Sequence, residues 1–275
     1  MKSISLFSAI LISSFAFGQH KNIRISAEAK PNEISIALNE NNLSEMLAGA
    51  NIASLYTSVN GGVTWKRTEQ KSVHGVWGDP VVAIDKKGNY YHLHLSKPED
   101  GNYIDRIVCQ KSTDKGLTFN NGSYAGLNGT KAQDKHWIDV DPESNTLYIS
   151  WTQFDKYDSK DPEDRSNILF SKSLDDGETW SPAMQINSVS GDCLDDDNTV
   201  EGAVPAVSAD GSVNISWAGP NGLVFNRSED GGKTWMKDEK KIDDMAGGWT
   251  IEISGIYRAN GLPITTAARS GGEYN

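Results

Sequence analysis

Short apolar segments recur along the chain, and each is bounded by polar residues, Gly or Pro. Such segments are typical of β-strands, and we expect no helix of any length. One set of segments follows a polar residue, Gly or Pro each time, and we interpret it as the innermost, buried strands of a repeated unit. These predicted inner strands are 33–37, 79–84, 136–140, 203–207 and 262–266.

Second and third strands follow the inner strands. The second strands are predicted at 90–95, 146–151 and 213–217, and the third strands at 107–112, 168–173 and 223–228. Each third strand runs into an octet of the form Ser-x-Asp-x-Gly-x-Thr-Trp, with small variations, at 58–65, 112–119, 173–180 and 228–235. The first serines of successive octets lie 54, 61 and 55 residues apart. This period suits one four-stranded blade of a propeller.

The octet has the chemistry of a hairpin corner. Asp or Asn at its third position accepts backbone N–H bonds, and Gly supplies the positive φ that the turn needs. Thr and Trp then begin the returning strand, where the indole ring can pack beneath the loop. We therefore interpret the octet as a folding device rather than a chemical site.

Together these patterns predict an all-β fold, a β-propeller of four-stranded antiparallel blades with the octets at the turns. The strand at 262–266 is not followed by an octet, so we expect about four and a half blades here, in a C-terminally truncated piece of a six-bladed protein. The octets are expected on the lower face of the propeller. Functional residues are expected on the upper face, where the inner strands begin.

Four octets at this spacing resemble those of the Asp-box, or BNR-repeat, proteins of the sialidase (neuraminidase) superfamily. The resemblance covers nearly the whole mature chain and implies a propeller that acts on carbohydrate, with exo-α-sialidase-type glycoside hydrolysis as the associated activity. It also implies three arginines that clamp the substrate carboxylate, a Tyr nucleophile activated by a Glu, and an Asp acid/base.

Several positions match that implied site. Arg24, in Ile23-Arg24-Ile25-Ser26, resembles the first clamp arginine, although the aromatic residue and the Pro of the family motif are missing. Glu201 resembles the Tyr-activating Glu, because an inner strand and then Asp-Gly follow it. Asp79 is the candidate acid/base, Arg258 is a candidate anion contact, and Tyr257 beside it is a further candidate catalytic residue. The identity of the nucleophile stays open, and a position beyond Asn275 is the alternative. Trp217 and Ala218 stand where the second clamp arginine is expected.

Two hypotheses for function follow. The first is an exo-acting glycoside hydrolase that uses Glu201, Asp79 and the arginines. The second is a non-catalytic module that binds glycan or protein through the same upper face, because similar boxes occur in proteins that share only the architecture. Convergence of Arg24, Arg258 and Arg269 beside Glu201 would distinguish them.

Aromatic and acidic residues gather at the positions predicted for the upper face. Tryptophan rings suit the C–H faces of sugars, although each ring can instead wedge between blades. The candidate rings are Trp77, Trp137, Trp151, Trp217 and Trp249. Carboxylates at the starts of inner strands are candidates for acid/base chemistry, or simply cap the strands and answer a Lys such as Lys135. These are Glu33, Asp79, Asp134 and Glu201.

No cofactor is required by these hypotheses, and metal sites are weaker candidates. Asp192, Asp195 and Asp197 place hard oxygen ligands close together in sequence, as a structural Ca²⁺ prefers, and the loop at 155–164 does the same. Acidic surface loops are also commonly only solvated. His92 and His94 would share one strand face, which suits Zn²⁺ only if a third ligand lies nearby.

Composition and the N-terminus bear on the compartment and on partners. Residues 1–18 have the charged start, apolar core and small-residue exit of a secretory signal, so we expect a secreted or periplasmic mature chain 19–275 without a membrane span. The net charge of −11 argues against nucleic acid as a partner, which leaves carbohydrate or glycoconjugate. Cys109 and Cys193 either pair or remain separate buried thiols. The sequence gives no indication of oligomeric state.

Overall fold

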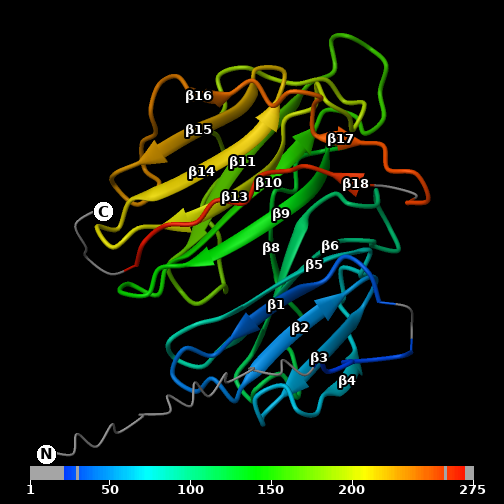
Figure 1. The fold of residues 1–275 in the computed structure, drawn as a ribbon, viewed down its shortest axis with the longest axis vertical. Helices are drawn as coiled ribbons and strands as arrows, with labels where there is room; N and C mark the ends of the chain where they lie inside the picture. Colours follow the sequence, from blue (N-terminus) through cyan, green and yellow to red (C-terminus); the bar gives the residue numbers. More distant parts are fainter. Residues whose placement is uncertain (1–21, 29–30, 257–258, 270–275) are drawn as a thin grey trace, which may run out of the picture.

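The structure is a computed structural model that describes residues 22–28, 31–256 and 259–269. Within these residues every regular element is a β-strand, and four antiparallel sheets of four strands follow one another along the chain (Figure 1). In each sheet the spatial order of the strands is their order in sequence. Each sheet is therefore a simple meander, which is the blade that the repeat of the octets predicts.

The blades are numbered in chain order. Blade 1 contains β1 (Ser35–Leu38), β2 (Met46–Ala50), β3 (Ser54–Ser58) and β4 (Lys66–Glu69). Blade 2 contains β5 (Gly78–Ile84), β6 (Tyr90–Leu95), β7 (Ile107–Ser112) and β8 (Ser123–Ala125). Blade 3 contains β9 (Ala132–Val140), β10 (Leu147–Phe154), β11 (Ser166–Ser173) and β12 (Met184–Gln185). Blade 4 contains β13 (Glu201–Val207), β14 (Val213–Gly219), β15 (Gly222–Ser228) and β16 (Lys240–Asp243). A short hairpin follows, β17 (Thr250–Ile251) with β18 (Ala259–Asn260).

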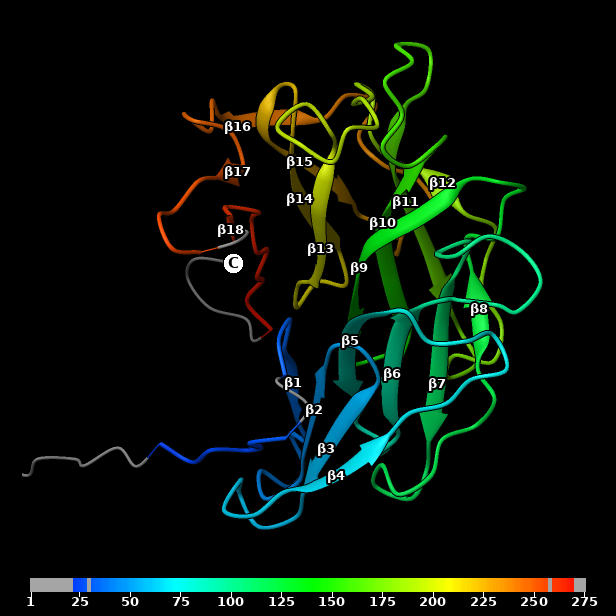
Figure 2. The same cartoon turned by 90° about the vertical axis from the view of Figure 1, so that its right-hand side faces the viewer.

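The first strands of the four blades pack beside one another around a common axis. β1 contacts β5, β5 contacts β9, and β9 contacts β13. Figure 2 shows these four strands toward the middle of the molecule and the last strands, β4, β8, β12 and β16, toward the outside. The propeller predicted from the sequence is confirmed.

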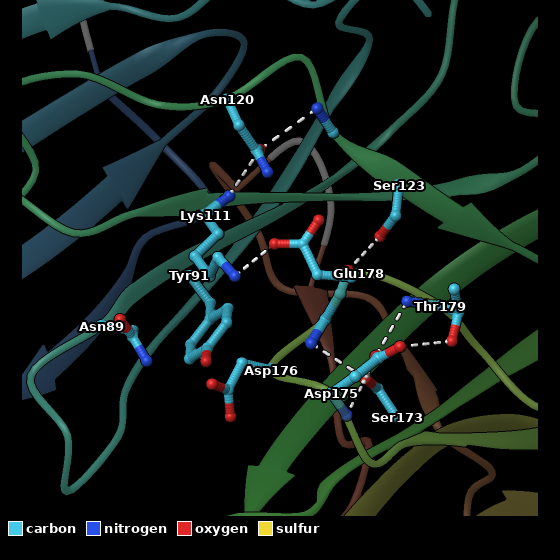
Figure 3. A network of polar contacts seen from close by, with 12 residues as sticks. Asn89, Tyr91, Lys111, Asn120, Ser123, Ser173, Asp175, Asp176, Glu178 and Thr179 are labelled. Carbon is cyan, nitrogen blue, oxygen red and sulfur yellow. Dashed lines mark hydrogen bonds and ion pairs between the residues drawn. The ribbon is translucent and has the colours of Figure 1, made fainter.

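The octets form the turns between the third and fourth strands, and their hydrogen bonds repeat from blade to blade. In blade 3, Ser173 Oγ donates to Asp175 and accepts the N–H of Gly177 at 2.9 Å, while Asp175 accepts the N–H of Thr179 at 2.9 Å (Figure 3). The hydroxyl of Thr179 closes the ring by donating to Asp175. Several hydrogen-bond donors face the Asp175 carboxylate. The bonds from Thr179 and then Ser173 lower its pKa to about 2.

Each octet from blade 2 onward also rests on the blade before it. A Cβ on Gly232 would lie 2.4 Å from the Phe170 ring of blade 3, and a Cβ on Gly116 would lie 2.7 Å from Thr57 of blade 1. In blade 3, Glu178 pairs with Lys111 of blade 2, and the carbonyl of Gly177 accepts a bond from Ser123 (Figure 3). The octet is therefore both a turn and a contact between neighbouring blades.

The cores lie between blades, where large rings fill the wedge left by twisted sheets. Trp151 is fully buried among residues of blades 2 and 3, and its Nε1 donates to Gln133 at 2.7 Å. Trp217 is fully buried in the cluster between blades 3 and 4. Cys109 and Cys193 are both buried free thiols, so of the two alternatives left by the sequence the unpaired one is correct.

The predicted fifth inner strand, 262–266, does not form a strand in the structure. Residues 262–266 join no strand ladder in the described part of the chain, and the preceding β17 and β18 pair only with each other. The segment instead lies along blade 4: Thr265 accepts the N–H of Ser216 at 3.0 Å, and Ala268 O accepts the N–H of Ala209 at 3.0 Å. Among the described residues there is also no helix long and apolar enough to cross a bilayer.

We predict that Gly232→Ala destabilises the protein more than Gly61→Ala does. Both residues have a left-handed φ, +77° and +69°, where a Cβ costs about 1–2 kcal/mol. A Cβ at Gly61 meets no atom within 4 Å, whereas at Gly232 it meets Phe170, so overpacking adds about 1–3 kcal/mol. Urea unfolding of both variants measures the difference, and equal losses would contradict the role of the octet as an inter-blade contact.

Candidate active site

The inner strands begin with an irregularity that repeats around the axis. Glu33, Asp79, Lys135 and Gly202 stand at equivalent positions and have φ of 46°, 51°, 47° and 77°. In blades 2, 3 and 4 the register to the second strand shifts at this point, so the residue sits in a β-bulge. A bulge re-aims the side chain, and all four residues line one cavity at the axis.

The side chains from blades 1, 2 and 3 form a continuous polar chain. Lys135 Nζ lies 3.2 Å from Asp79 Oδ2, and the carboxyl groups of Asp79 and Glu33 contact each other. Asn51, in the loop between β2 and β3, completes the chain: its Nδ2 donates to Glu33, and its Oδ1 accepts the N–H of Asp79 at 2.7 Å. The two carboxyl groups are thus held together from both ends.

The environment separates the proton affinities of the two carboxyl groups. Burial and then the charge of Asp79 raise the pKa of Glu33. Burial also acts to raise the pKa of Asp79, but Lys135 and the neighbouring His136 outweigh it, and the pKa is lowered. Two neighbouring carboxyl groups cannot both ionise easily, so Asp79 ionises first and Glu33 binds its proton more tightly than Asp79 does.

Two further carboxyl groups lie buried beside Lys135. Burial, with the charge of Asp79, raises the pKa of Asp134 to about 7. Glu201 is fully buried, and burial together with Asp195 and Asp134 raises its pKa well above the usual range. Neither oxygen of Glu201 has an N–H donor among the described residues, and its carboxyl group contacts that of Asp195. Burial disfavours the charge on Lys135, yet the surrounding carboxylates raise the pKa of this ammonium group.

The axial cavity has a volume of about 220 Å³, enough for a single sugar ring. Its rim carries Glu33, Asp79 and Lys135, and its walls are apolar. Trp137 of β9 lines both this cavity and a second one of about 330 Å³ farther along the axis. The apolar wall residues are Ile34, Pro80, Val81, Trp137, Leu262, Pro263 and Ile264. The site therefore combines an apolar surface with charged groups at one end.

Several solved structures share this arrangement of blades. A protein of unknown function from Dyadobacter fermentans aligns with a TM-score of 0.56 and 15% identity, over 77% of this chain and 68% of its own. A mutant α-L-arabinofuranosidase from Fusarium graminearum, in complex with an iminosugar inhibitor, aligns with a TM-score of 0.56 and 16% identity, over 76% of this chain and 65% of its own. The leech intramolecular trans-sialidase, complexed with 2,7-anhydro-Neu5Ac, aligns with a TM-score of 0.54 and 12% identity, over 82% and 54%.

The chain has the sialidase-like propeller fold. At these identities the likeness establishes the fold alone, and the chain spans between about half and two thirds of the solved chains described above. No protein-family model and no curated protein sequence matches it.

In the described part of this sialidase-like propeller, Arg24 and Arg269 do not come together as the arginine clamp that the resemblance implied. Arg24 is exposed, bonds to the carbonyl of Ser26 and does not line the axial cavity. Arg269 pairs with Asp139 in the second axial cavity, away from the carboxylate rim. Tyr257 and Arg258 lie outside the described residues. The expectation that Arg24 contacts an anion beside Glu201 is therefore wrong for this structure.

Three of the five tryptophans predicted for ligand binding are packing residues. Trp151, Trp217 and Trp249 are at most 2% exposed and offer no ring face to a ligand. Trp249 Nε1 instead donates to the carbonyl of Thr199. Trp77 is 39% exposed, packs edge-on against Tyr103 and lies under Lys97, while Trp137 lines the axial cavity. The three buried rings pack against neighbouring blades and are shielded from solvent, which is the alternative that the sequence left open.

The proposed calcium ligands do not converge. Asp192 accepts from Thr199, Asp195 accepts from Tyr157 Oη at 2.7 Å, and Asp197 accepts the N–H of Thr250. The described residues contain no group of three acidic, His or Cys side chains that could hold a metal ion. These aspartates serve as turn caps and anchors, so the three-aspartate metal site is wrong in this structure. His92 and His94 are likewise buried without a third ligand in the described part of the chain.

Sequence reasoning missed Asn51 and gave Lys135 only a structural role. Lys135 follows a buried Asp at the start of an inner strand, in register with Asp79 of the preceding blade. That register was available from the repeat and is the signal that would have paired them. Asn51 has no such signal, because it lies in a loop of blade 1 outside the repeated strand starts and its contact with Asp79 crosses to blade 2.

We predict that Asp134→Asn flattens the fall in stability between about pH 4 and pH 7. The folded pKa of Asp134 lies at about 7, above its unfolded value near 4, so the folded state holds the proton longer and unfolding becomes easier as pH rises through this window. Above pH 7 the variant should be more stable than the wild type, by on the order of 2–4 kcal/mol. Urea unfolding at pH 4 to 8 measures this, with exposed Asp100→Asn as control. Parallel profiles for wild type and Asp134→Asn would refute the assignment.

Proposed function

We propose that this propeller cleaves a glycosidic bond at the axial cavity, with Glu33 as the proton donor and Asp79 as the carboxylate base. One observation carries the proposal: two carboxyl groups from adjacent blades interact with each other, and of the two only Asp79 forms an ion pair with Lys135. Paired carboxyl groups whose proton affinities differ are the groups that glycoside hydrolysis needs.

The reaction would proceed as acid/base hydrolysis. Glu33 gives its proton to the leaving glycosidic oxygen as the bond from that oxygen to the anomeric carbon breaks. Asp79 takes a proton from water as the water oxygen bonds to the same carbon. The carboxyl groups touch in the free protein, so the sugar must enter between them, which the exposed position of Glu33 allows. Lys135 favours the ionised form of Asp79 until Asp79 accepts that proton.

Trp137 and the apolar wall would hold the sugar ring. An aromatic face and aliphatic side chains suit the C–H groups of a pyranose or furanose, while the rim binds its hydroxyl groups. Glu201, matched earlier to the Tyr-activating Glu, is fully buried beside Asp195. We assign it to the support of Lys135 rather than to contact with substrate.

The charge around the cavity bears on the choice between sialidase and other glycosidase activity. Glu33, Asp79, Asp134 and Glu201 surround a single ammonium group, and that group is already paired. A sialic acid carboxylate would meet this cluster without the arginines that stabilise it in sialidases. We therefore propose a neutral sugar for the axial cavity, and exo-α-sialidase activity becomes an outcome that the experiment decides.

Two features support a carbohydrate rather than another ligand. The arabinofuranosidase and the trans-sialidase described above share the fold and were solved with sugar-like ligands. The cavity also has the mixed apolar and polar lining typical of sugar sites. We further propose that the chain is exported with cleavage after Gly18, which mass spectrometry of the mature N-terminus tests.

We predict that Asp79→Asn and Glu33→Gln each lower kcat by about 10²–10⁴ on a cleaved glycoside, because each removes one half of the acid/base pair. The purified full chain should be screened with fluorogenic glycosides of neutral sugars and a fluorogenic sialoside. The exposed carboxylate Glu229, on the octet face, provides the control Glu229→Gln, which should leave kcat unchanged.

Three outcomes would count against parts of this proposal. Hydrolysis of the sialoside alone would overturn the neutral-sugar assignment and restore the sialidase hypothesis. Hydrolysis that survives both substitutions would overturn the Glu33 and Asp79 assignment. Binding of a glycan with no turnover of any substrate would replace the enzyme by the non-catalytic binding module.

A further inference from the structure

A second hollow lies on the upper face of blade 1, directly beside the carboxylate pair. It is an open groove of about 830 Å³, and Asn51 belongs both to its wall and to the polar chain that holds Glu33 and Asp79. The groove exists because the loop between β2 and β3 has only three residues, 51–53, whereas the corresponding loop of blade 2 has eleven, 96–106. The upper loop of blade 1 is therefore shorter than that of blade 2, which leaves the groove open between them.

The walls of the groove are fixed by buried contacts. The segment from blade 1 to blade 2 begins at Gln70, whose N–H donates to Ala53 O at 2.7 Å and whose side chain donates to buried Gln110 at 3.1 Å. Gln110 in turn donates to the carbonyl of Lys71 at 2.9 Å. Gly75, where a Cβ would lie 1.9 Å from Lys97 O, seats the far end of the segment on blade 2. A preformed wall favours binding, because little order has to be imposed.

The charge of the groove is opposite to that of the axial cavity. Arg67 and Lys71 line it, with Glu69 as the acidic residue of the lining. Neither cation has a carboxylate within 4.0 Å among the described residues, although the chain carries 37 acidic against 26 basic residues. Arg67 is held in place by Ser54, whose Oγ accepts from its Nε and Nη2 at 3.2 and 3.1 Å. Its Nη1 edge is left for a ligand.

We infer that this groove is a second saccharide subsite that binds a sugar unit bearing an anionic group, a uronate carboxylate or a sulfate ester, through Arg67 and Lys71. A guanidinium fork that is already oriented matches such a group in geometry and charge. Resting on the proposed function, the inference names the substrate as an acidic oligosaccharide whose neutral unit lies in the axial cavity. The opposite charges of the two sites then fix the direction in which the saccharide binds.

The test is calorimetric titration of the full chain with trigalacturonate, which probes the groove alone because every one of its units is charged, and with its methyl ester, which has the same rings without the charges. We expect trigalacturonate to bind at least tenfold more tightly than the ester, and Arg67→Met to remove that advantage, because a charge-assisted hydrogen bond is lost. Lys71→Met should have a smaller effect, since a point charge lacks the bidentate geometry.

The matched control is Arg165→Met, an exposed arginine on the upper loop of blade 3 whose guanidinium group bonds only to the carbonyl of Pro162 in the described structure. It should bind trigalacturonate like the wild type, and thermal unfolding should show that both arginine variants fold. A sulfated galactan tetrasaccharide in a parallel titration distinguishes sulfate from carboxylate recognition. Equal affinity for acid and ester, or no loss in Arg67→Met, would overturn the inference.

Failure of the inference can be distinguished from failure of the proposed function. Trigalacturonate that binds Asp79→Asn with the same dependence on Arg67 supports the groove even if no glycoside is cleaved. Glycoside cleavage that depends on Asp79 but is indifferent to Arg67, with no trigalacturonate binding, would remove the groove and leave the axial site.

Discussion

The contact between neighbouring blades is the constraint on which the rest of this structure depends. A blade is a twisted sheet, and a ring of blades is stable only if each sheet meets the next at a fixed angle. The octets help to set this angle, because the turn glycine leaves room for the ring or side chain of the blade before it, as Gly232 does for Phe170. The same angle places the starts of the inner strands within hydrogen-bonding reach of one another.

That placement turns a local backbone feature into a site. A left-handed residue at the start of an inner strand is costly unless its surroundings hold it, and here it recurs at Glu33, Asp79 and Lys135. Each of these side chains points at the side chain from the adjacent blade, so the site exists only between blades and not within any one of them. This explains why a single blade could not carry the acid/base pair.

Sequence alone predicted the fold well and the site only in part, for a physical reason. The octets specify a turn through their own side chains, so their spacing revealed the blades. The apolar segments between the octets gave the first and last residues of β6 and β7. Asp79 and Glu33 were found because both stand at the starts of predicted inner strands, on the face where functional residues were expected. The solvent exposure of the tryptophans was not predictable from the sequence. Whether Trp151 faces a ligand or a neighbouring blade depends on the angle between the two packed sheets. Arg24 was chosen from a sequence motif and Arg269 from its position after the fifth inner strand. In the structure Arg24 bonds to the nearby carbonyl of Ser26, and Arg269 pairs with Asp139, which is distant in sequence.

The upper face therefore carries opposite charges in two regions, acidic at the axis and basic in the groove of blade 1. Acidic groups crowd the axis, where burial raises the pKa of most of them, while Lys135 holds the pKa of Asp79 below its usual value. The unpaired cations lie farther out, beside the short loop of blade 1, with Asn51 between the two regions. Bringing an anion close to the axis would cost free energy, whereas the same anion in the groove would be stabilised. A ligand with charge at one end only can satisfy both regions at once, and only in one orientation.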